Sequence, residues 1–192
     1  MQIEYEATFI DIDKEAIRKK LTQAGAELVR PEFMQKRITF NLPAGHEIEG
    51  GWLRVRDEGD KITMTLKVID GNKIEDQKET TIKVDDLNQA AQLLSKIGCR
   101  QKSYQETKRE IWELDGVEIM IDEWPYLEPF VEIEGKSEQA VRTVAEKLGF
   151  DYSKALFCPT TTIYSLKYDL AEAVINNEIP RITFDEKNPF IA

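Results

Sequence analysis

Residues 52–69 read WLRVRDEGDKITMTLKVI, and this stretch decides the fold class. Apolar and polar residues alternate from Trp52 to Arg56 and again from Lys61 to Ile69, with Glu58-Gly59-Asp60 between the two runs. Alternation with a period of two is typical of a strand that buries one face, and a short polar turn containing glycine between two such runs is typical of a hairpin. The stretch therefore predicts two adjacent antiparallel strands.

The same signals continue on both sides of this hairpin. Further strands are predicted over 2–10, 27–41, 74–84, 100–114, 117–123 and 130–134. Helices are predicted over 13–24, 85–97, 137–148 and 161–176, and a short edge strand or docking segment over 181–184. Hairpins dominate and no strand–helix–strand series appears, so the sequence predicts an α+β protein built on an antiparallel barrel or curved sheet.

Composition and charge exclude several classes of protein. The 192 residues include 36 Asp and Glu against 26 Lys and Arg, a net charge of −10, which disfavours nucleic-acid binding over the whole surface. No apolar run approaches the roughly 20 residues of a membrane helix, and the first residues show no secretory signal, so we expect a cytoplasmic protein. One histidine, His46, and two distant cysteines provide no zinc cluster, and we expect both thiols to be free.

Charged residues are sorted by sign along the predicted strands. The carboxylates are Glu4, Glu6, Glu132 and Glu134 on two strands, and the cations are Arg54, Arg56 and Lys67 on two others. A solvated surface usually mixes both signs, which limits self-repulsion. A bound phosphate chain, bridged to the carboxylates by a divalent cation, would relieve the repulsion, because Arg and Lys bind phosphate oxygens and Glu is a ligand for Mg²⁺ or Mn²⁺. The pattern indicates either a metal–phosphate site or strand faces whose charged side chains are simply solvated.

An ordered series of short motifs resembles the CYTH superfamily, the triphosphate tunnel metalloenzymes. The motifs are Glu4-Tyr5-Glu6-Ala7-Thr8, Leu53-Arg54-Val55-Arg56, Thr65-Leu66-Lys67, Lys78-Glu79-Thr80, Thr107-Lys108-Arg109-Glu110-Ile111 and Phe130-Val131-Glu132-Ile133-Glu134. They span residues 2–168, and their order is more specific than any single motif. The segment 108–134 looks most like the bacterial class IV adenylate cyclases; the superfamily also includes thiamine triphosphatases and inorganic triphosphatases.

This resemblance implies a closed eight-stranded antiparallel barrel, the triphosphate tunnel, over residues 1–168, with helices packed outside. We expect the tail, 169–192, to pack on the same domain. The implied substrate-binding residues are Lys36 or Arg37, Arg54, Arg56, Lys67, Glu79 and Arg109, together with Lys108, which strand parity directs away from Arg109. The implied ligands for Mg²⁺ or Mn²⁺ are Glu4, Glu6, Asp122, Glu132 and Glu134, and the implied catalytic residues are Glu4, Glu6 and Thr8.

One departure from the family pattern bears on the activity. Thr8 stands where the family signature has a lysine, which in the hydrolytic members is thought to help orient the attacking water. Thr8 shares the face of Glu4 and Glu6 but offers a hydroxyl in place of a charge. This difference argues against efficient hydrolysis.

Three functions remain open at this point. The expected function is divalent-metal-dependent hydrolysis of an inorganic or organic triphosphate. The first alternative is a class IV-type adenylate cyclase, which makes cyclic AMP and pyrophosphate from ATP, and the second is a non-catalytic binder of triphosphate or polyphosphate. The candidate ligands are tripolyphosphate, ATP and thiamine triphosphate; we expect no nucleic acid, no membrane, and a monomer or homodimer.

Overall fold

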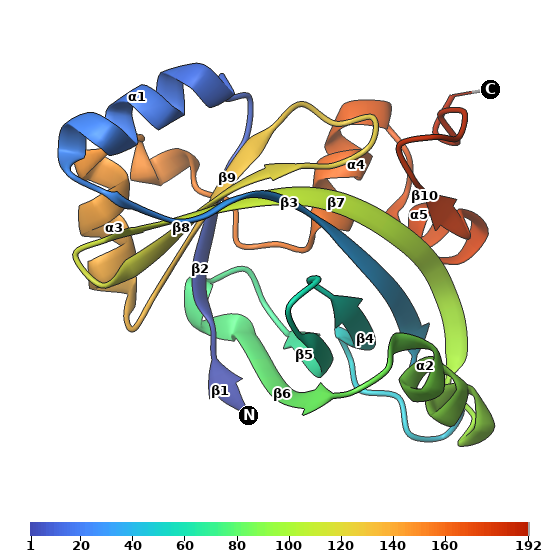
Figure 1. Ribbon diagram of the computed structural model, residues 1–192. Helices are drawn as coiled ribbons and strands as arrows, with labels where there is room; N and C mark the ends of the chain where they lie inside the picture. The colour runs from blue at the N-terminus through green and yellow to red at the C-terminus, as the bar shows by residue number, and fades with distance from the viewer. Residues whose placement is uncertain (192) are drawn as a thin grey trace.

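A computed structural model describes residues 1–191 of the chain (Figure 1). Its strands are β1 (Gln2–Ile3), β2 (Tyr5–Phe9), β3 (Glu27–Asn41), β4 (Gly51–Asp57), β5 (Ile62–Ile69), β6 (Gln77–Val84), β7 (Arg100–Leu114), β8 (Val117–Glu123), β9 (Phe130–Gly135) and β10 (Arg181–Ile182). Its α-helices are α1 (Lys14–Ala24), α2 (Leu87–Lys96), α3 (Glu138–Lys147), α4 (Thr160–Tyr168) and α5 (Glu172–Glu178), and two 3₁₀ turns are η1 (Ile74–Asp76) and η2 (Tyr152–Lys154).

The strands form a nearly closed antiparallel barrel with the order β1-β6-β5-β4-β3-β7-β8-β9-β2. The N-terminal segment connects the two ends of the sheet, because β1 pairs with β6 and β2 pairs with β9. Between them, the Glu4 amide donates to the Gln77 carbonyl at 2.9 Å. The predicted α+β barrel is confirmed, but within residues 1–191 it has nine strands rather than eight, since the first expected strand is divided at Glu4.

Helices α1 and α3 pack against the outside of the sheet (Figure 1). Ile17 and Leu21 of α1 join Val141 and Val144 of α3 in one buried cluster with the outward apolar residues of β2, β8 and β9. Each of these side chains contributes about 1.5–3 kcal/mol when fully buried. Apolar residues of the strands thus face the helices, which leaves the polar face of the same strands for the barrel interior.

The C-terminal region differs in detail from its prediction. The single helix expected over 161–176 is two helices, because Asp169 adopts a left-handed conformation (φ 54°, ψ 40°) that ends α4. The Phe190 ring stacks on Tyr164 at 4.3 Å and on Tyr168 at 5.0 Å, and β10 pairs in parallel with β7. Residue 192 of the expected tail lies outside the described residues. Within 1–191, no helix is long and apolar enough to cross a membrane.

Candidate functional site

The barrel encloses a cavity of about 750 Å³. Charged side chains from five segments line it, and they occupy alternate strand positions: Glu4 and Glu6, Arg54 and Arg56, Lys67, Glu79, and Glu132 and Glu134. The alternation has a simple cause, since every second side chain of a strand points to the same face. Strand parity therefore brings these eight residues from distant parts of the chain into one space.

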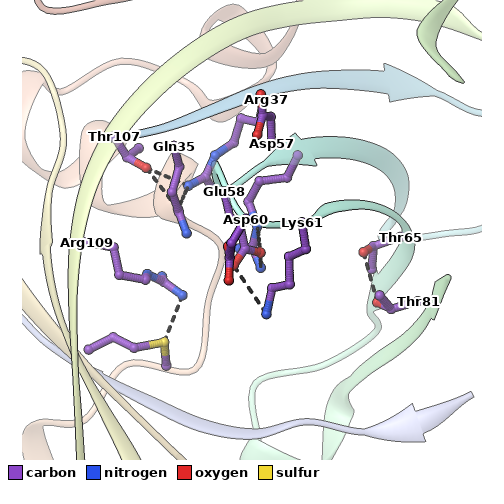
Figure 2. A network of polar contacts seen from close by, with 12 residues as sticks. Gln35, Arg37, Asp57, Glu58, Asp60, Lys61, Thr65, Thr81, Thr107 and Arg109 are labelled. Carbon is purple, nitrogen blue, oxygen red and sulfur yellow. Dashed lines mark hydrogen bonds and ion pairs between the residues drawn. The ribbon is translucent and has the colours of Figure 1, made fainter. Parts of the chain in front are cut away.

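Two buried arginines on adjacent strands make up the centre of the basic wall. Arg37 of β3 donates to the Gln35 amide oxygen and to the Thr107 hydroxyl, both at 2.7 Å (Figure 2), and its guanidinium lies over the Trp124 ring. Arg54 of β4 is buried, and within residues 1–191 its guanidinium makes no hydrogen bond or ion pair with another side chain. Burial, followed by repulsion from Arg56, lowers the pKa of Arg54 to about 10 and that of Arg37 well below its usual value. Neither cation has a carboxylate partner among residues 1–191, so both are available to an anion.

The third arginine of this wall has a carboxylate partner that the sequence patterns did not single out. Arg56 lies 2.7 Å from Glu58, and Lys61 lies 3.4 Å from the same carboxylate. Glu58 and Lys61 stand together at the end of the β4–β5 hairpin (Figure 2). Glu58 is only 3% exposed and lines the cavity. The sequence does contain a signal for Glu58: it lies two residues after Arg56 and so continues the alternation of the cavity-facing positions, although it follows the end of β4.

The acidic wall contains a compact cluster of three carboxylates. Oxygen atoms of Glu4, Glu6 and Glu134 all lie within 4.8 Å of one another. Burial, and then the neighbouring carboxylates, raise the pKa of Glu6 well above its usual value and that of Glu134 to about 7. Burial also disfavours the charged form of Glu4, but Lys67, Arg54 and Arg56 together outweigh it and lower the pKa of Glu4. Three mutually repelling oxygen donors form a suitable ligand set for a hard divalent cation.

A second acidic group surrounds Arg109 of β7. Arg109 donates to both oxygens of Asp122, at 2.7 and 2.5 Å, and to Glu132 at 2.5 Å. The same guanidinium also donates to the sulfur of Met120 at 2.8 Å. Burial opposes its charge, but Asp122 and Glu132 raise the pKa of Arg109 well above its usual value. Asp122 was expected among the metal ligands; it is buried, does not line the cavity and instead neutralises Arg109.

Three further predicted site residues lie outside the cavity. Lys36 is exposed on β3, so Arg37 is the member of that pair that lines the cavity. Lys108 forms an ion pair with Glu123 at 2.9 Å and also stays out of the cavity, because strand parity turns it away from Arg109. Thr8 pairs in register with Glu132, yet it is buried and does not line the cavity.

A wall of the cavity comes from segments that the sequence analysis left without a role. Residues 157–162 and α5 contribute Cys158, Thr162, Glu172 and Asn176. The Thr162 hydroxyl donates to Glu172 at 2.6 Å. Burial raises the pKa of the Cys158 thiol to about 11. Both cysteines are free, as expected. No sequence motif identifies this wall, because its residues reach the cavity only through the packing of α4 and α5.

Lys102 also lines the cavity, although strand parity predicts the opposite. Register pairs Thr39 with Ser103 but the next residue, Phe40, with Gln101. Lys102 is therefore the extra residue of a β-bulge in β7, and a bulge redirects a side chain. Alternation alone could not have found this residue.

Comparison with known proteins agrees with this architecture. The family model described as "CYTH domain" matches residues 2–163. A "putative adenylate cyclase" of Methanocaldococcus jannaschii is 28% identical over 124 residues, which cover 64% of this chain and 70% of that protein.

Solved structures of low sequence identity share the fold. A "putative adenylate cyclase" from Vibrio parahaemolyticus superposes with a TM-score of 0.72 at 14% identity, over 85% of this chain and 98% of the other. A "putative adenylyl cyclase" from Hippeastrum, for which a dominant triphosphatase activity is stated, gives a TM-score of 0.57 at 11% identity, over 88% of this chain and 97% of the other. With its motifs, its barrel and its charged cavity, this chain belongs to the CYTH domain family.

Proposed function

We propose that this protein is a divalent-metal-dependent enzyme that hydrolyses an inorganic or organic triphosphate inside the barrel. One observation carries the proposal: two buried guanidinium groups that have no carboxylate partner in the described part of the chain share one cavity with a cluster of three carboxylates. The group of arginines and the group of carboxylates are each electrostatically unfavourable alone, because like charges repel strongly in a poorly solvated space. A bound triphosphate and a bound cation would relieve both halves together.

The basic wall binds and orients the phosphate chain in this proposal. Arg54 and Arg37 donate paired N–H groups to phosphoryl oxygens, the geometry for which arginine is suited. Arg56 and Lys67 add positive charge to the same wall. An ion pair with Glu58 holds Arg56 in place, and an ion pair with Glu4 holds Lys67 in place. Positioning and charge stabilisation of this kind supply most of the catalysis of phosphoryl transfer.

The acidic cluster has two roles in the proposal. Glu4, Glu6 and Glu134 hold Mg²⁺ or Mn²⁺, which when bound supplies a Lewis acid for phosphate oxygens. A carboxylate oxygen of Glu6 that the cation leaves free would accept the proton of the attacking water. Arg109, neutralised by Asp122 and Glu132, acts by holding Glu132 in position at the edge of the cluster.

A substrate panel tests the proposal. The purified protein is assayed with tripolyphosphate, ATP and thiamine triphosphate in Mg²⁺ and in Mn²⁺, for both orthophosphate and cyclic AMP. We expect orthophosphate release that a chelator abolishes and that Arg54→Met reduces strongly. Absence of orthophosphate from all three substrates under both metals contradicts the hydrolase assignment.

Two alternatives have their own support. The similarity to a "putative adenylate cyclase" of Methanocaldococcus jannaschii favours cyclase activity, for which the same assay yields cyclic AMP and pyrophosphate from ATP. Thr8, in place of a cation, favours a non-catalytic binder, for which the triphosphates raise the melting temperature and no product forms. The panel, together with melting temperatures measured with the same ligands, separates all three functions.

A further inference from the structure

Trp124 follows β8 directly and lies between the cavity and the C-terminal part of the chain. Its side chain is only 5% exposed, and it lines the cavity. The guanidinium carbon of Arg37 lies 4.5 Å from the centroid of its ring. A guanidinium over the face of an indole is attracted to the ring, most strongly where water is excluded. The ring therefore confines one side of a cation that the proposed function assigns to the phosphate chain.

The indole N–H of Trp124 indicates that this residue serves through its ring. Within residues 1–191 the buried Nε1 atom has no hydrogen-bond partner. A buried tryptophan usually places this group on an acceptor, and an unpaired buried donor is costly. A phenylalanine or a leucine would fill apolar space without that cost, whereas the indole face is the best aromatic partner for a cation. The position thus favours a ring that holds a cation over a side chain that only fills the core.

The loop that carries Trp124 has a strained backbone that α4 holds in place. Tyr126 has a φ of 66°, a left-handed conformation that a bulky residue adopts only when its surroundings impose it. The Tyr164 hydroxyl donates to the Pro125 carbonyl at 2.7 Å, and the Tyr168 hydroxyl donates to the Tyr126 carbonyl at 2.6 Å. These two hydrogen bonds from α4 fix the course of the chain immediately after Trp124.

The C-terminal segment packs against the same tyrosines. The Phe190 ring stacks on Tyr164 at 4.3 Å and on Tyr168 at 5.0 Å. The Tyr126 hydroxyl donates to the Thr183 carbonyl at 2.8 Å. Apart from Tyr126, these residues lie beyond the stretch that the family model matches. A part of the chain that the model does not cover therefore supports the loop.

We infer that Trp124 is a positioning residue, whose ring holds the Arg37 guanidinium where the phosphate chain binds, and that the segment 164–190 contributes to triphosphate binding through it. This inference rests on the proposed function, because it takes Arg37 to bind the phosphate chain. It goes further by giving the aromatic residues around the β8–β9 loop a role in binding. Without the ring or its support, the guanidinium keeps its charge but loses order, and the ligand must then supply the cost of ordering it.

Variants at two positions and a matched control test the inference. Trp124→Leu removes the aromatic face, whereas Trp124→Phe keeps one. Phe190→Leu disrupts the stack of the C-terminal segment on α4. Phe150→Leu is the control, because it disrupts a comparable stack, on Phe9 at 4.4 Å, in the cluster outside the barrel. Each substitution is also combined with Arg37→Met, which gives a double-mutant cycle.

Calorimetric titration in Mg²⁺ with tripolyphosphate, ATP and thiamine triphosphate identifies a ligand of the wild type. Its dissociation constant is then measured for every variant, at a temperature at which melting curves show the variant to be folded. Trp124→Leu should weaken binding by about tenfold, the size of a desolvated cation–ring attraction, and Trp124→Phe by no more than about threefold. Phe190→Leu should weaken binding by about fivefold, and Phe150→Leu should leave it unchanged. In the Arg37→Met protein, none of these substitutions should weaken binding by more than about twofold, because the guanidinium through which they act is absent.

Three results overturn the inference and leave the proposed function standing. They are wild-type affinity in Trp124→Leu, equal losses in Trp124→Leu and Trp124→Phe, and a loss in Trp124→Leu that is the same with and without Arg37. If Trp124→Leu does not fold, the Phe190→Leu cycle decides, and equal losses with and without Arg37, or in Phe190→Leu and Phe150→Leu, overturn the inference. A wild type that binds none of the three ligands overturns both the inference and the proposed function.

Discussion

Lys67 Nζ lies 2.6 Å from a carboxylate oxygen of Glu4, and this ion pair joins the basic strands to the carboxylate cluster. Both side chains are largely buried and line the cavity. Glu79 lies 3.9 Å from the same ammonium, so Lys67 is shared between two carboxylates. The pair fixes the distance between the part of the cavity suited to an anion and the part suited to a cation.

Arg54 and Arg56 of the basic wall should differ in what their removal does to the fold. Arg54→Met removes a buried cation that has no side-chain partner within residues 1–191 and lies beside two other arginines. We therefore expect triphosphate binding to fall by about tenfold or more and the free energy of unfolding to stay equal or rise. Arg56→Met leaves Glu58 with Lys61 alone, and should cost about 1–3 kcal/mol of stability. Denaturant unfolding and ligand titration of both variants give the comparison. A loss of stability in Arg54→Met as large as that in Arg56→Met would show that Arg54 has a structural partner.

The carboxylate cluster should make stability depend on divalent cations. Added Mg²⁺ or Mn²⁺ should raise the melting temperature of the wild type, because a cation that binds only the folded state stabilises it. Glu134→Gln removes one charge of the cluster, so the variant should gain less from either metal and should be no less stable than the wild type in a chelator. Equal metal-induced shifts for the two proteins would exclude Glu134 from the metal site.

The buried Glu58 should contribute to stability only above acid pH. Burial opposes its charge, but Arg56 and Lys61 lower its pKa below the usual 4.5. A carboxyl group with a lowered pKa in the folded state stabilises that state above the unfolded pKa and loses the effect as pH falls through the folded pKa. The stability difference between the wild type and Glu58→Gln should therefore be constant from pH 6 to 8 and shrink below about pH 4.5. A difference that does not change down to pH 3 would show that Glu58 is not charged in the folded protein.

Arg109 should be a positioning residue with a large structural effect. Arg109→Met leaves Asp122 and Glu132 buried without their cation, which should cost about 3–5 kcal/mol of stability. Adding Asp122→Asn to this variant removes one uncompensated charge and should restore part of the loss. Urea unfolding of the single and double variants measures both effects. No recovery in the double variant would mean that the cost arises from packing rather than from charge.

Thr8→Lys tests the departure from the family signature. The wild type should release orthophosphate from tripolyphosphate slowly, and a lysine at this position, opposite Glu132 in register, should raise the rate by about tenfold through charge stabilisation. Thr8→Met, of similar length and without charge, is the control for steric effects. A wild type that is already fast and that Thr8→Lys slows would show that Thr8 is suited to the reaction as it stands.

Much of the barrel and of its charged lining could be predicted from local pattern. Alternation along each strand placed Glu4 and Glu6 on one face, Arg54 and Arg56 on another, and Glu132 and Glu134 on a third, and the structure turns all six into the cavity. The reason is that the period of two is a property of the extended backbone itself and needs no knowledge of distant contacts. Turn residues such as Glu58-Gly59-Asp60 likewise indicated the hairpins from local sequence.

Only the tertiary structure decided which charges neutralise one another. Asp122 compensates Arg109 rather than joining the carboxylate cluster. Among the residues that the structure describes, Arg54 has no partner, whereas Arg56 has Glu58. These pairings depend on strand register and on burial, which set both the distance and the dielectric screening between residues far apart in the chain. The bulge that turns Lys102 inward is a shift in the register between β3 and β7, so it depends on both strands and cannot be predicted from either one alone. Helix α5 reaches the cavity only because it packs beside β7.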